Sequence, residues 1–242
     1  MNYPQNVILR GLVGSGVHGV AIDGTDDRDE MGVCVEPPEH FFGLRSRFEQ
    51  YEYRSQPRGI RSGPGDLDLT IYSLAKFARL ALAGNPSVLV LLFVPEDRCT
   101  VLTDQGRALR ALAPRFVGNN IFGPYLGYMK QTRLRLTENR KMPRRPELVA
   151  RYGYDTKYAG HLIRLGYQGV EMATTGRLTL PMVKHERQRI LDIRNGVIVL
   201  QAVLDEAVEL ESRLAAMKGH HDLLDPDVSS VERFVVDQYL GR

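Results

Sequence analysis

The stretch VILRGLVGSGVHGVAIDGTDDRDEMGVCV, residues 7–35, decides which fold this chain can adopt. Its first part, residues 7–13, is apolar and rich in β-branched side chains, and it predicts a strand. A glycine-rich turn follows at residues 14–19. Residues 30–35 predict a second strand, which ends at a proline pair because proline cannot donate to a strand ladder. The chain therefore begins with two strands joined by a short connection that is first glycine-rich and then acidic.

The turn GSGVHG at residues 14–19 has the spacing G-x-G-x-x-G, which is typical of dinucleotide-binding folds. In those folds a helix of about ten residues or more follows at once, and its N-terminus holds the pyrophosphate. Here only residues 20–22 separate the turn from the acidic segment around Gly24. Because a βαβ unit cannot be built from so short a connection, the sequence argues against a dinucleotide site.

A second interpretation combines the Gly14-Ser15 turn with Asp27 and Asp29. The backbone N–H groups of such a turn can cradle a phosphate. Residues two apart on a strand point to one face, so the two carboxylates converge, and they repel each other unless a cation lies between them. Mg²⁺ is bound by one or two carboxylates together with substrate phosphate oxygens. A solvated acidic loop after Gly24 is the competing interpretation.

A further carboxylate is expected on a neighbouring strand. Residues 66–72 alternate between polar and apolar side chains, which predicts a half-buried strand. Asp66 and Asp68 share one face of this strand, and either would complete a two-metal site for in-line phosphoryl transfer.

The remaining pattern predicts helices. Ser73 is a good N-cap for a helix over residues 74–83, which Gly84 and a following proline end. The second half of the chain is mostly helical, with a long amphipathic helix at residues 190–218 and a short last helix at residues 230–239. We therefore expect an α+β protein, with a small mixed β-sheet followed by a helical C-terminal half.

Composition excludes several classes of protein. Hydrophobic residues make up 43% and charged residues 25%, which is ordinary for a globular chain. The net charge of +3 permits a polyanionic partner. Two cysteines provide neither a disulfide framework nor a cysteine-rich zinc site. The N-terminus lacks signal-peptide features, and the longest apolar run, residues 88–94, cannot span about 30 Å of hydrocarbon. We expect a soluble, cytoplasmic protein without a membrane partner.

The Gly-Ser turn, the Asp-x-Asp pair and the strand Asp together resemble the nucleotidyltransferase superfamily that includes DNA polymerase β. Within it, the stretches Asp68 to Phe93 and Gly153 to Leu165 are similar to the RNA repair pathway DNA polymerase β family. The resemblance runs in order from about Leu12 to Leu180. In two places this chain departs from the usual family pattern. It has Asp26 in place of a serine and Val90 in place of a glutamate.

This resemblance implies a metal-dependent nucleotidyltransferase that moves an NMP from an NTP such as ATP to a hydroxyl acceptor. The implied cofactor is Mg²⁺, with Mn²⁺ as the alternative ion. The expected acceptor is an RNA end in repair or modification. Two alternatives stay open: an enzyme that nucleotidylates protein, and a non-catalytic nucleotide-binding partner of an RNA-processing system. The implied architecture is a palm-like nucleotidyltransferase core at residues 1–100 and a helical domain at residues 101–242 that covers the nucleotide cleft.

The resemblance also implies roles for single residues. Gly14 and Ser15 would contact the incoming triphosphate. Asp27 and Asp29 would bind the metal ions, with the third carboxylate on the strand before Tyr72. The sequence offers two acids for that third position, and Asp68 is preferred over Asp66.

Basic residues form a second group of candidates. Lys157, His161 and Arg164 are spaced to share one face of a helix, where they would bind triphosphate or nucleic-acid phosphate. A solvated face is the alternative.

Two basic segments are further candidates for substrate contacts. The run Lys130–Arg145, with Tyr125 and Tyr128 just before it, would hold a nucleic-acid backbone or else form a solvated surface. Three arginines lie in a glycine-rich loop that would close over substrate as a lid or remain a plain loop; they are Arg54, Arg58 and Arg61.

Overall fold

The computed structural model describes residues 3–22, 24, 26–40, 44, 47–57, 59–138, 145–218 and 224–241. The chain forms two compact units, which are described separately here. Unit 1 consists of Met1–Phe116, Thr179–Pro181 and Pro226–Arg242, and unit 2 consists of Val117–Leu178 and Met182–Asp225. The functional division into a core of residues 1–100 and a helical domain of residues 101–242 stays a prediction.

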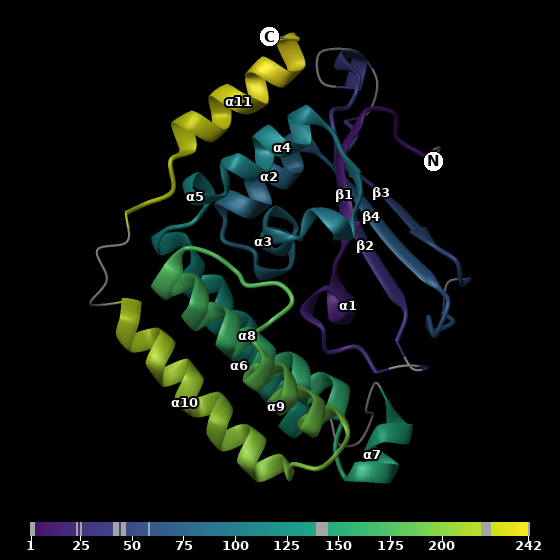
Figure 1. Cartoon of the computed structure of the whole chain (residues 1–242), viewed down its shortest axis with the longest axis vertical. Coiled ribbons are helices and arrows are strands. Elements are labelled where there is room, and N and C mark those ends of the chain that lie inside the picture. The colour runs from purple at the N-terminus through teal and green to yellow at the C-terminus, as the bar shows by residue number, and fades with distance from the viewer. Residues whose placement is uncertain are drawn as a thin grey trace. The chain divides into compact units, whose positions relative to one another are not determined.

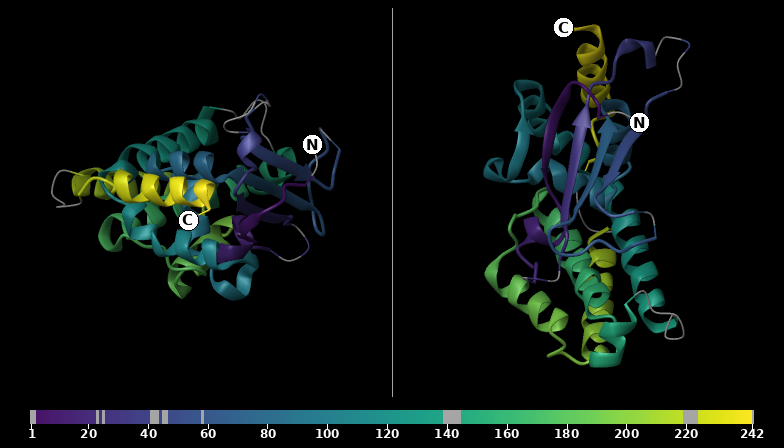
Figure 2. Two further views of the ribbon diagram at one scale, coloured as in Figure 1. Left: turned by 90° about the horizontal axis from the view of Figure 1, so that it is seen from above. Right: turned by 90° about the vertical axis from the view of Figure 1, so that its right-hand side faces the viewer.

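Unit 1 is built on one five-stranded sheet with the strand order β3-β4-β2-β1-β5 (Figure 1). Strands β2 and β4 are parallel, whereas the other neighbouring pairs are antiparallel. The strands, purple to blue, run side by side in the right-hand view of Figure 2. This mixed sheet and the helical second half confirm the predicted α+β class. The strands are β1 (Val7–Leu12), β2 (Arg28–Cys34), β3 (Gln50–Arg54), β4 (Leu67–Ser73) and β5 (Cys99–Leu102).

The glycine-rich segment after β1 is a five-residue helix, α1 (Gly14–His18), rather than an open turn. It ends at Gly19, whose φ of 72° is in the left-handed region that glycine adopts readily. The chain then returns to β2, which pairs with β1 in antiparallel orientation. A dinucleotide-binding unit needs parallel strands on either side of a long helix. The argument against that fold is therefore confirmed.

Helices cover the sheet of unit 1. Ser73 caps α2 as predicted, because its side chain accepts a hydrogen bond from the Lys76 N–H at 3.1 Å. Helix α3 holds the most apolar run of the chain, and both α3 and α4 contact β1. The C-terminal helix α11 contacts α2 and α5, and the Tyr239 hydroxyl donates to Glu36 at 2.6 Å. The helices are α2 (Leu74–Leu82), α3 (Pro86–Phe93), α4 (Asp104–Ala111), α5 (Ala113–Phe116) and α11 (Val228–Leu240), with 3-10 turns at Pro38–His40 and Glu96–Arg98.

A small apolar cluster fills the other side of this sheet. Cys34, Leu69 and Ile71 are buried there, and partly buried side chains that include Phe48 and Tyr51 pack against them. Successive side chains along β2 and along β4 therefore point alternately to the two faces of the sheet, and odd-numbered residues of β2 share a face with even-numbered residues of β4. This alternation fixes which carboxylates of the two strands can meet.

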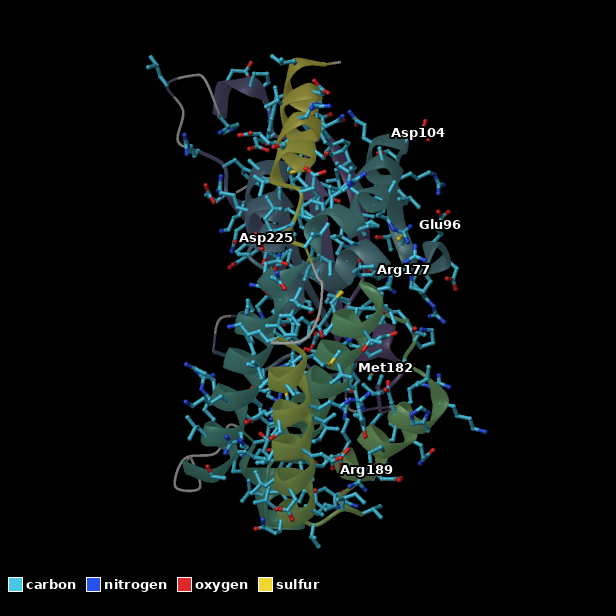
Figure 3. The ribbon with its side chains drawn as sticks, turned by 90° about the vertical axis from the view of Figure 1, so that its left-hand side faces the viewer. Glu96, Asp104, Arg177, Met182, Arg189 and Asp225 are labelled. Carbon is cyan, nitrogen blue, oxygen red and sulfur yellow. The ribbon has the colours of Figure 1, made fainter. Side chains whose placement is uncertain are left out.

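In its described residues, unit 2 contains helices and no strand, and its central helix is α8, which contacts α6, α9 and α10. A Cβ added at Gly169 would lie 2.8 Å from Leu214 and 3.0 Å from Tyr125, so glycine permits this close packing. On α9, Arg189 donates to Glu206 of α10, and Figure 3 labels this arginine. The elements are α6 (Phe122–Glu138), α7 (Pro146–Tyr152), α8 (Thr156–Thr175), α9 (Lys184–Arg194) and α10 (Leu200–Lys218), with a 3-10 turn at Asn119–Ile121.

The single long helix predicted at residues 190–218 is wrong, because the chain breaks between α9 and α10. The break includes Gly196, whose φ is 73°. A Cβ at this glycine would lie 2.1 Å from the Tyr152 ring, so glycine is required where the chain passes α7. In the described part of the chain, no single helix has the length and apolar composition of a membrane span, and only the bent pair α2–α3, with 111° between its helices, meets that test jointly.

Candidate functional site

Three carboxylates meet at one end of the sheet in unit 1. Asp27 directly precedes β2, Asp29 is the second residue of β2, and Asp68 is the second residue of β4. The parallel register places Asp29 opposite Asp68. One carboxylate oxygen from each of the three residues lies within 4.8 Å of the others. The structure therefore brings together the three acids that the sequence favoured, in a group called the triad below.

The donor set of the triad fits a hard divalent cation. All three side chains are partly buried and offer only oxygen ligands, which Mg²⁺ and Mn²⁺ prefer. Carboxylates this close repel one another, so a cation between them lowers the energy of the group. Among the residues that the structure describes, no other three His, Cys, Asp or Glu side chains are close enough to share an ion.

Gly14 lies directly against the triad. Its φ is +63°, and a Cβ at this position would lie 2.1 Å from Asp29 Oδ2. The preceding residue holds the same strand, since the Val13 N–H donates to the Asp29 carbonyl at 2.9 Å. Glycine is therefore required here for two reasons, the left-handed backbone and the close approach of a carboxylate. Ser15 follows on α1 and is partly buried.

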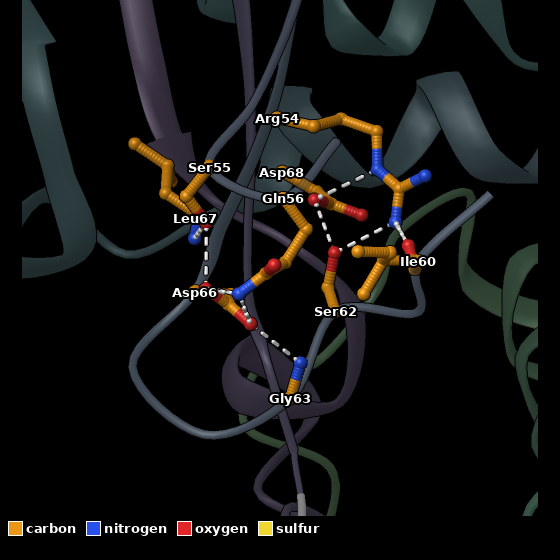
Figure 4. A network of polar contacts seen from close by, with 9 residues as sticks. All are labelled: Arg54, Ser55, Gln56, Ile60, Ser62, Gly63, Asp66, Leu67 and Asp68. Carbon is orange, nitrogen blue, oxygen red and sulfur yellow. Dashed lines mark hydrogen bonds and ion pairs between the residues drawn. The ribbon is translucent and has the colours of Figure 1, made fainter. Parts of the chain in front are cut away.

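Asp66, the other acid considered for the third position, lies outside the triad. Its carboxylate accepts hydrogen bonds at 2.9 Å from the Gly63 N–H, the Gln56 amide and the Ser55 hydroxyl (Figure 4). These donors, led by the Gly63 N–H, hold the pKa of Asp66 below its usual value. Asp66 thus organises the segment between β3 and β4, whereas Asp68 faces the other two acids.

Asp68 is in turn held by two residues that the sequence did not single out as its partners. Its Oδ1 accepts from Arg54 Nε at 3.2 Å and from the Ser62 hydroxyl at 2.7 Å. The Arg54 Nη2 also donates to the Ser62 hydroxyl at 2.7 Å (Figure 4). Arg54 is the last residue of β3 and pairs across the strands with Asp68. Sequence reasoning missed this pairing because β3 lacks apolar periodicity and was not predicted.

The structure describes two of the three arginines predicted to form a lid. Arg54 belongs to β3 and is bound into the network around Asp68. Arg61 is described and exposed, whereas Arg58 lies outside the described residues. The segment is anchored by Asp66 at one end and by Arg54 at the other.

In unit 2, the predicted phosphate-binding residues Lys157, His161 and Arg164 lie on α8. Arg164 Nη2 lies 2.7 Å from His161 Nδ1. Burial, with the nearby charge of Arg164 and then of Arg145, lowers the pKa of His161 to about 3. His161 is therefore neutral near pH 7 and accepts a hydrogen bond from Arg164, so that Lys157 and Arg164 supply the positive charge of this face.

The basic run Lys130–Arg145 is less open than its composition indicates. Residues 139–144 lie outside the described part of the chain. Arg133 forms a two-fold hydrogen bond with Glu211 at 2.9 and 3.0 Å, and Arg145 pairs with Asp155 at 3.2 Å.

The idea that Tyr125 stacks on a base is wrong, because this side chain is fully buried in unit 2. Tyr128 is 42% exposed and remains available for such a contact.

A comparison with known protein families identifies one that matches nearly the whole chain. A family model described as the RNA repair pathway DNA polymerase beta family matches residues 1–236. No curated protein matches the chain. A solved structure similar to it is a nucleotidyltransferase-like protein from Exiguobacterium sibiricum, with 9% identity and a TM-score of 0.33, covering 98% of this chain and 75% of that one.

Proposed function

The chain belongs to the RNA repair pathway DNA polymerase beta family, and on that premise we propose that it transfers an NMP from an NTP to a hydroxyl group at an RNA end. Family membership itself indicates a nucleotidyltransferase in RNA repair. The observation that carries the finer proposal is the triad, with one oxygen of each acid within 4.8 Å of the others.

The proposed cofactor is Mg²⁺, with Mn²⁺ as the alternative, held by Asp27, Asp29 and Asp68. A pair of such ions, when bound, would supply Lewis-acid stabilisation of the attacking and leaving oxygens. Asp27 and Asp29 would help to hold both ions, and Asp68 would help to hold the ion that activates the acceptor hydroxyl. The hard, all-oxygen donor set supports this choice of metal.

The reaction proposed for the site is an in-line displacement. The acceptor hydroxyl oxygen forms a bond to the α-phosphorus, the bond between the α-phosphorus and its bridging oxygen breaks, and pyrophosphate leaves. The hydroxyl proton passes to solvent. Gly14 and Ser15 would bind the triphosphate through backbone N–H groups, which suit phosphate oxygens. The glycine at position 14 lets this segment lie directly beside Asp29.

Lys157, His161 and Arg164 of unit 2 are proposed to bind phosphate groups of the nucleotide or the RNA. Lys157 would act as a point charge and Arg164 as a two-pronged donor. The neutral His161 accepts from Arg164 and so fixes the direction of its guanidinium. His161 is therefore proposed to act through Arg164 rather than as a cation.

The test is a transfer assay with α-³²P-labelled NTPs, Mg²⁺ or Mn²⁺, and a mixed RNA pool, with RNA and protein products resolved on gels. The Asp27→Asn/Asp29→Asn double variant removes two metal ligands and is expected to abolish labelling. Asp97→Asn is the control, because Asp97 is exposed on a 3-10 turn. Label on RNA that disappears in the double variant supports the proposal. Label on protein favours a protein-modifying enzyme, and NTP binding without transfer favours a non-catalytic partner.

A further inference from the structure

We propose that Arg54 and Ser62 are positioning residues that fix the third carboxylate of the triad, Asp68, and that the β3–β4 connection thereby sets the geometry of the metal site. This inference rests on the function proposed above and deepens it. It assigns to the segment between Arg54 and Asp68 a part in the reaction that neither the family nor the fold specifies.

The first observation is the double engagement of one carboxylate oxygen. Asp68 Oδ1 accepts from Arg54 Nε at 3.2 Å and from the Ser62 hydroxyl at 2.7 Å. A carboxylate that accepts two hydrogen bonds on one oxygen cannot rotate freely about its χ2 torsion. Because both donors engage Oδ1 of Asp68, its Oδ2 would serve as the metal ligand.

The second observation is that the two donors are tied to each other. The Arg54 Nη2 donates to the Ser62 hydroxyl at 2.7 Å and to the Ile60 carbonyl at 3.3 Å (Figure 4). A guanidinium can do this because its N–H groups form a rigid planar fork, whereas a lysine ammonium is a single point of charge. One side chain thus links the strand, the connection and the carboxylate.

The third observation is that the connection is itself held in place. Asp66 accepts from the Gly63 N–H, and its own N–H donates to the Gly63 carbonyl at 3.0 Å. At the other end, the Ser55 hydroxyl accepts from the Leu67 N–H at 3.0 Å. Ser62 is 9% exposed, although the connection runs over the surface. Ser62 is therefore presented by a stretch of the connection that these hydrogen bonds hold.

The charge of Arg54 and the orientation that it imposes on Asp68 have opposite effects: the charge weakens cation binding, whereas the orientation favours the chemical step. The Arg54 guanidinium lowers the repulsion within the triad but competes with a divalent cation for the same carboxylate. Removing it should leave the affinity for the cation unchanged or tighter. It should also release Asp68 from its fixed orientation and so slow the chemical step, because small misplacements of reacting groups are costly. A merely structural role would instead lower metal affinity, turnover and thermal stability together.

The experiment uses the full chain with Mn²⁺ alone as the probe, followed by electron paramagnetic resonance, and then steady-state transfer with labelled NTP. The variants are Arg54→Ala, Arg54→Lys and Ser62→Ala. The matched controls are Arg79→Ala, which breaks an exposed arginine–glutamate pair at 3.3 Å, and Ser87→Ala, which alters an exposed serine.

In the Arg54 and Ser62 variants we expect a changed spectrum of bound Mn²⁺, a dissociation constant for Mn²⁺ equal to or below that of the wild type, and a kcat lowered by about 10- to 100-fold. Arg54→Lys keeps the charge but loses the fork, so its kcat should fall as in Arg54→Ala. The controls should match the wild type in all three measurements.

Wild-type spectra and a kcat within about two-fold of the controls would overturn the positioning role. A joint loss of Mn²⁺ affinity, kcat and Tm would overturn it in favour of a structural role. If the wild type does not bind Mn²⁺, or if Asp27→Asn leaves its Mn²⁺ binding unchanged, the proposed function fails and this inference fails with it. If the wild type binds Mn²⁺ and transfers label, and the Arg54 and Ser62 variants behave in the same way, only the positioning role fails.

Discussion

Asp29 and Asp68 are direct partners in the parallel register of β2 and β4. Their side chains fall on one face because directly paired residues of neighbouring strands point to the same side of a sheet. Asp27 precedes Asp29 by two residues and therefore follows the same alternation. Two neighbouring strands with the same direction thus deliver three carboxylates to one point, and the pairing of the strands, rather than any single motif, makes the candidate metal site.

The approach of Gly14 to Asp29 predicts a specific effect of a single methyl group. Gly14→Ala places a Cβ at 2.1 Å from Asp29 Oδ2 and forces an alanine into a left-handed φ of +63°. Gly24→Ala is the matched control, because Gly24 has a φ of +72° and nothing within 4 Å of its Cβ. Gly24→Ala should lose about 1–2 kcal/mol of unfolding free energy, measured by denaturant titration, and Gly14→Ala should lose more because of its clash with Asp29. Only Gly14→Ala should also weaken Mn²⁺ binding, and equal Mn²⁺ affinities in the two variants would contradict the account.

The different surroundings of Asp66 and Asp68 predict different effects of the same substitution. Asp68→Asn removes a ligand of the triad and should weaken Mn²⁺ binding by about ten-fold or more, since even outer-shell partners of a metal contribute that much. Asp66→Asn should leave Mn²⁺ affinity near the wild-type value, because Asp66 bonds to its own loop. Isothermal titration of both variants compares them directly. A larger loss in Asp66→Asn than in Asp68→Asn would reverse the assignment.

The lowered pKa of His161 predicts a dependence of stability on pH. In the folded chain the imidazole titrates at about 3, whereas its ordinary pKa is 6.5. Between these values the unfolded state binds the proton and the folded state does not, so the free energy of unfolding falls as pH is lowered through this window.

His161→Gln removes that contribution, so its unfolding free energy should fall less than that of the wild type between about pH 7 and about pH 5. Chemical denaturation at the two pH values measures the difference. His185→Gln, which alters an exposed histidine of α9, is the control. A pH slope in His161→Gln equal to that of the wild type would show that folding does not lower the pKa of His161.

The phosphate-binding role of α8 predicts a change in substrate affinity. Lys157→Ala should raise the KM for NTP or for RNA by about ten-fold with little change in kcat, as expected for loss of one charge-assisted contact that is equally strong in the ground and transition states. Lys184→Ala, an exposed lysine at the start of α9, is the control. Equal KM values in the two variants would leave α8 without a part in substrate binding.

Local patterns were sufficient to predict much of unit 1. The apolar, β-branched residues predicted β1, the extended segment before the proline pair predicted β2, and the alternation of residues 66–72 predicted β4. The cap at Ser73 predicted the start of α2. The Asp-x-Asp spacing put two carboxylates on one face. These features depend on neighbours in the sequence, and they are the ones that propensity and periodicity describe.

Features that depend on distant contacts were not predictable. Strand β3 is half exposed and lacks an apolar period, so the Arg54–Asp68 pairing had no local signal. The close approach of Gly196 to the Tyr152 ring, which is 44 residues away in the sequence, likewise had no local signal. The choice between Asp66 and Asp68 likewise depends on which hydrogen bonds each acid makes after the chain has folded.

The central claim is that the triad catalyses transfer of a nucleoside monophosphate. The most direct measurement compares NTP labelled at the α-phosphate with NTP labelled at the γ-phosphate, incubated with RNA and Mg²⁺ and with the wild type, Asp29→Asn or Asp97→Asn. The account predicts that RNA acquires the α-label and not the γ-label, in the wild type and Asp97→Asn but not in Asp29→Asn. Transfer of the γ-label, or undiminished α-labelling by a folded Asp29→Asn variant, would contradict it.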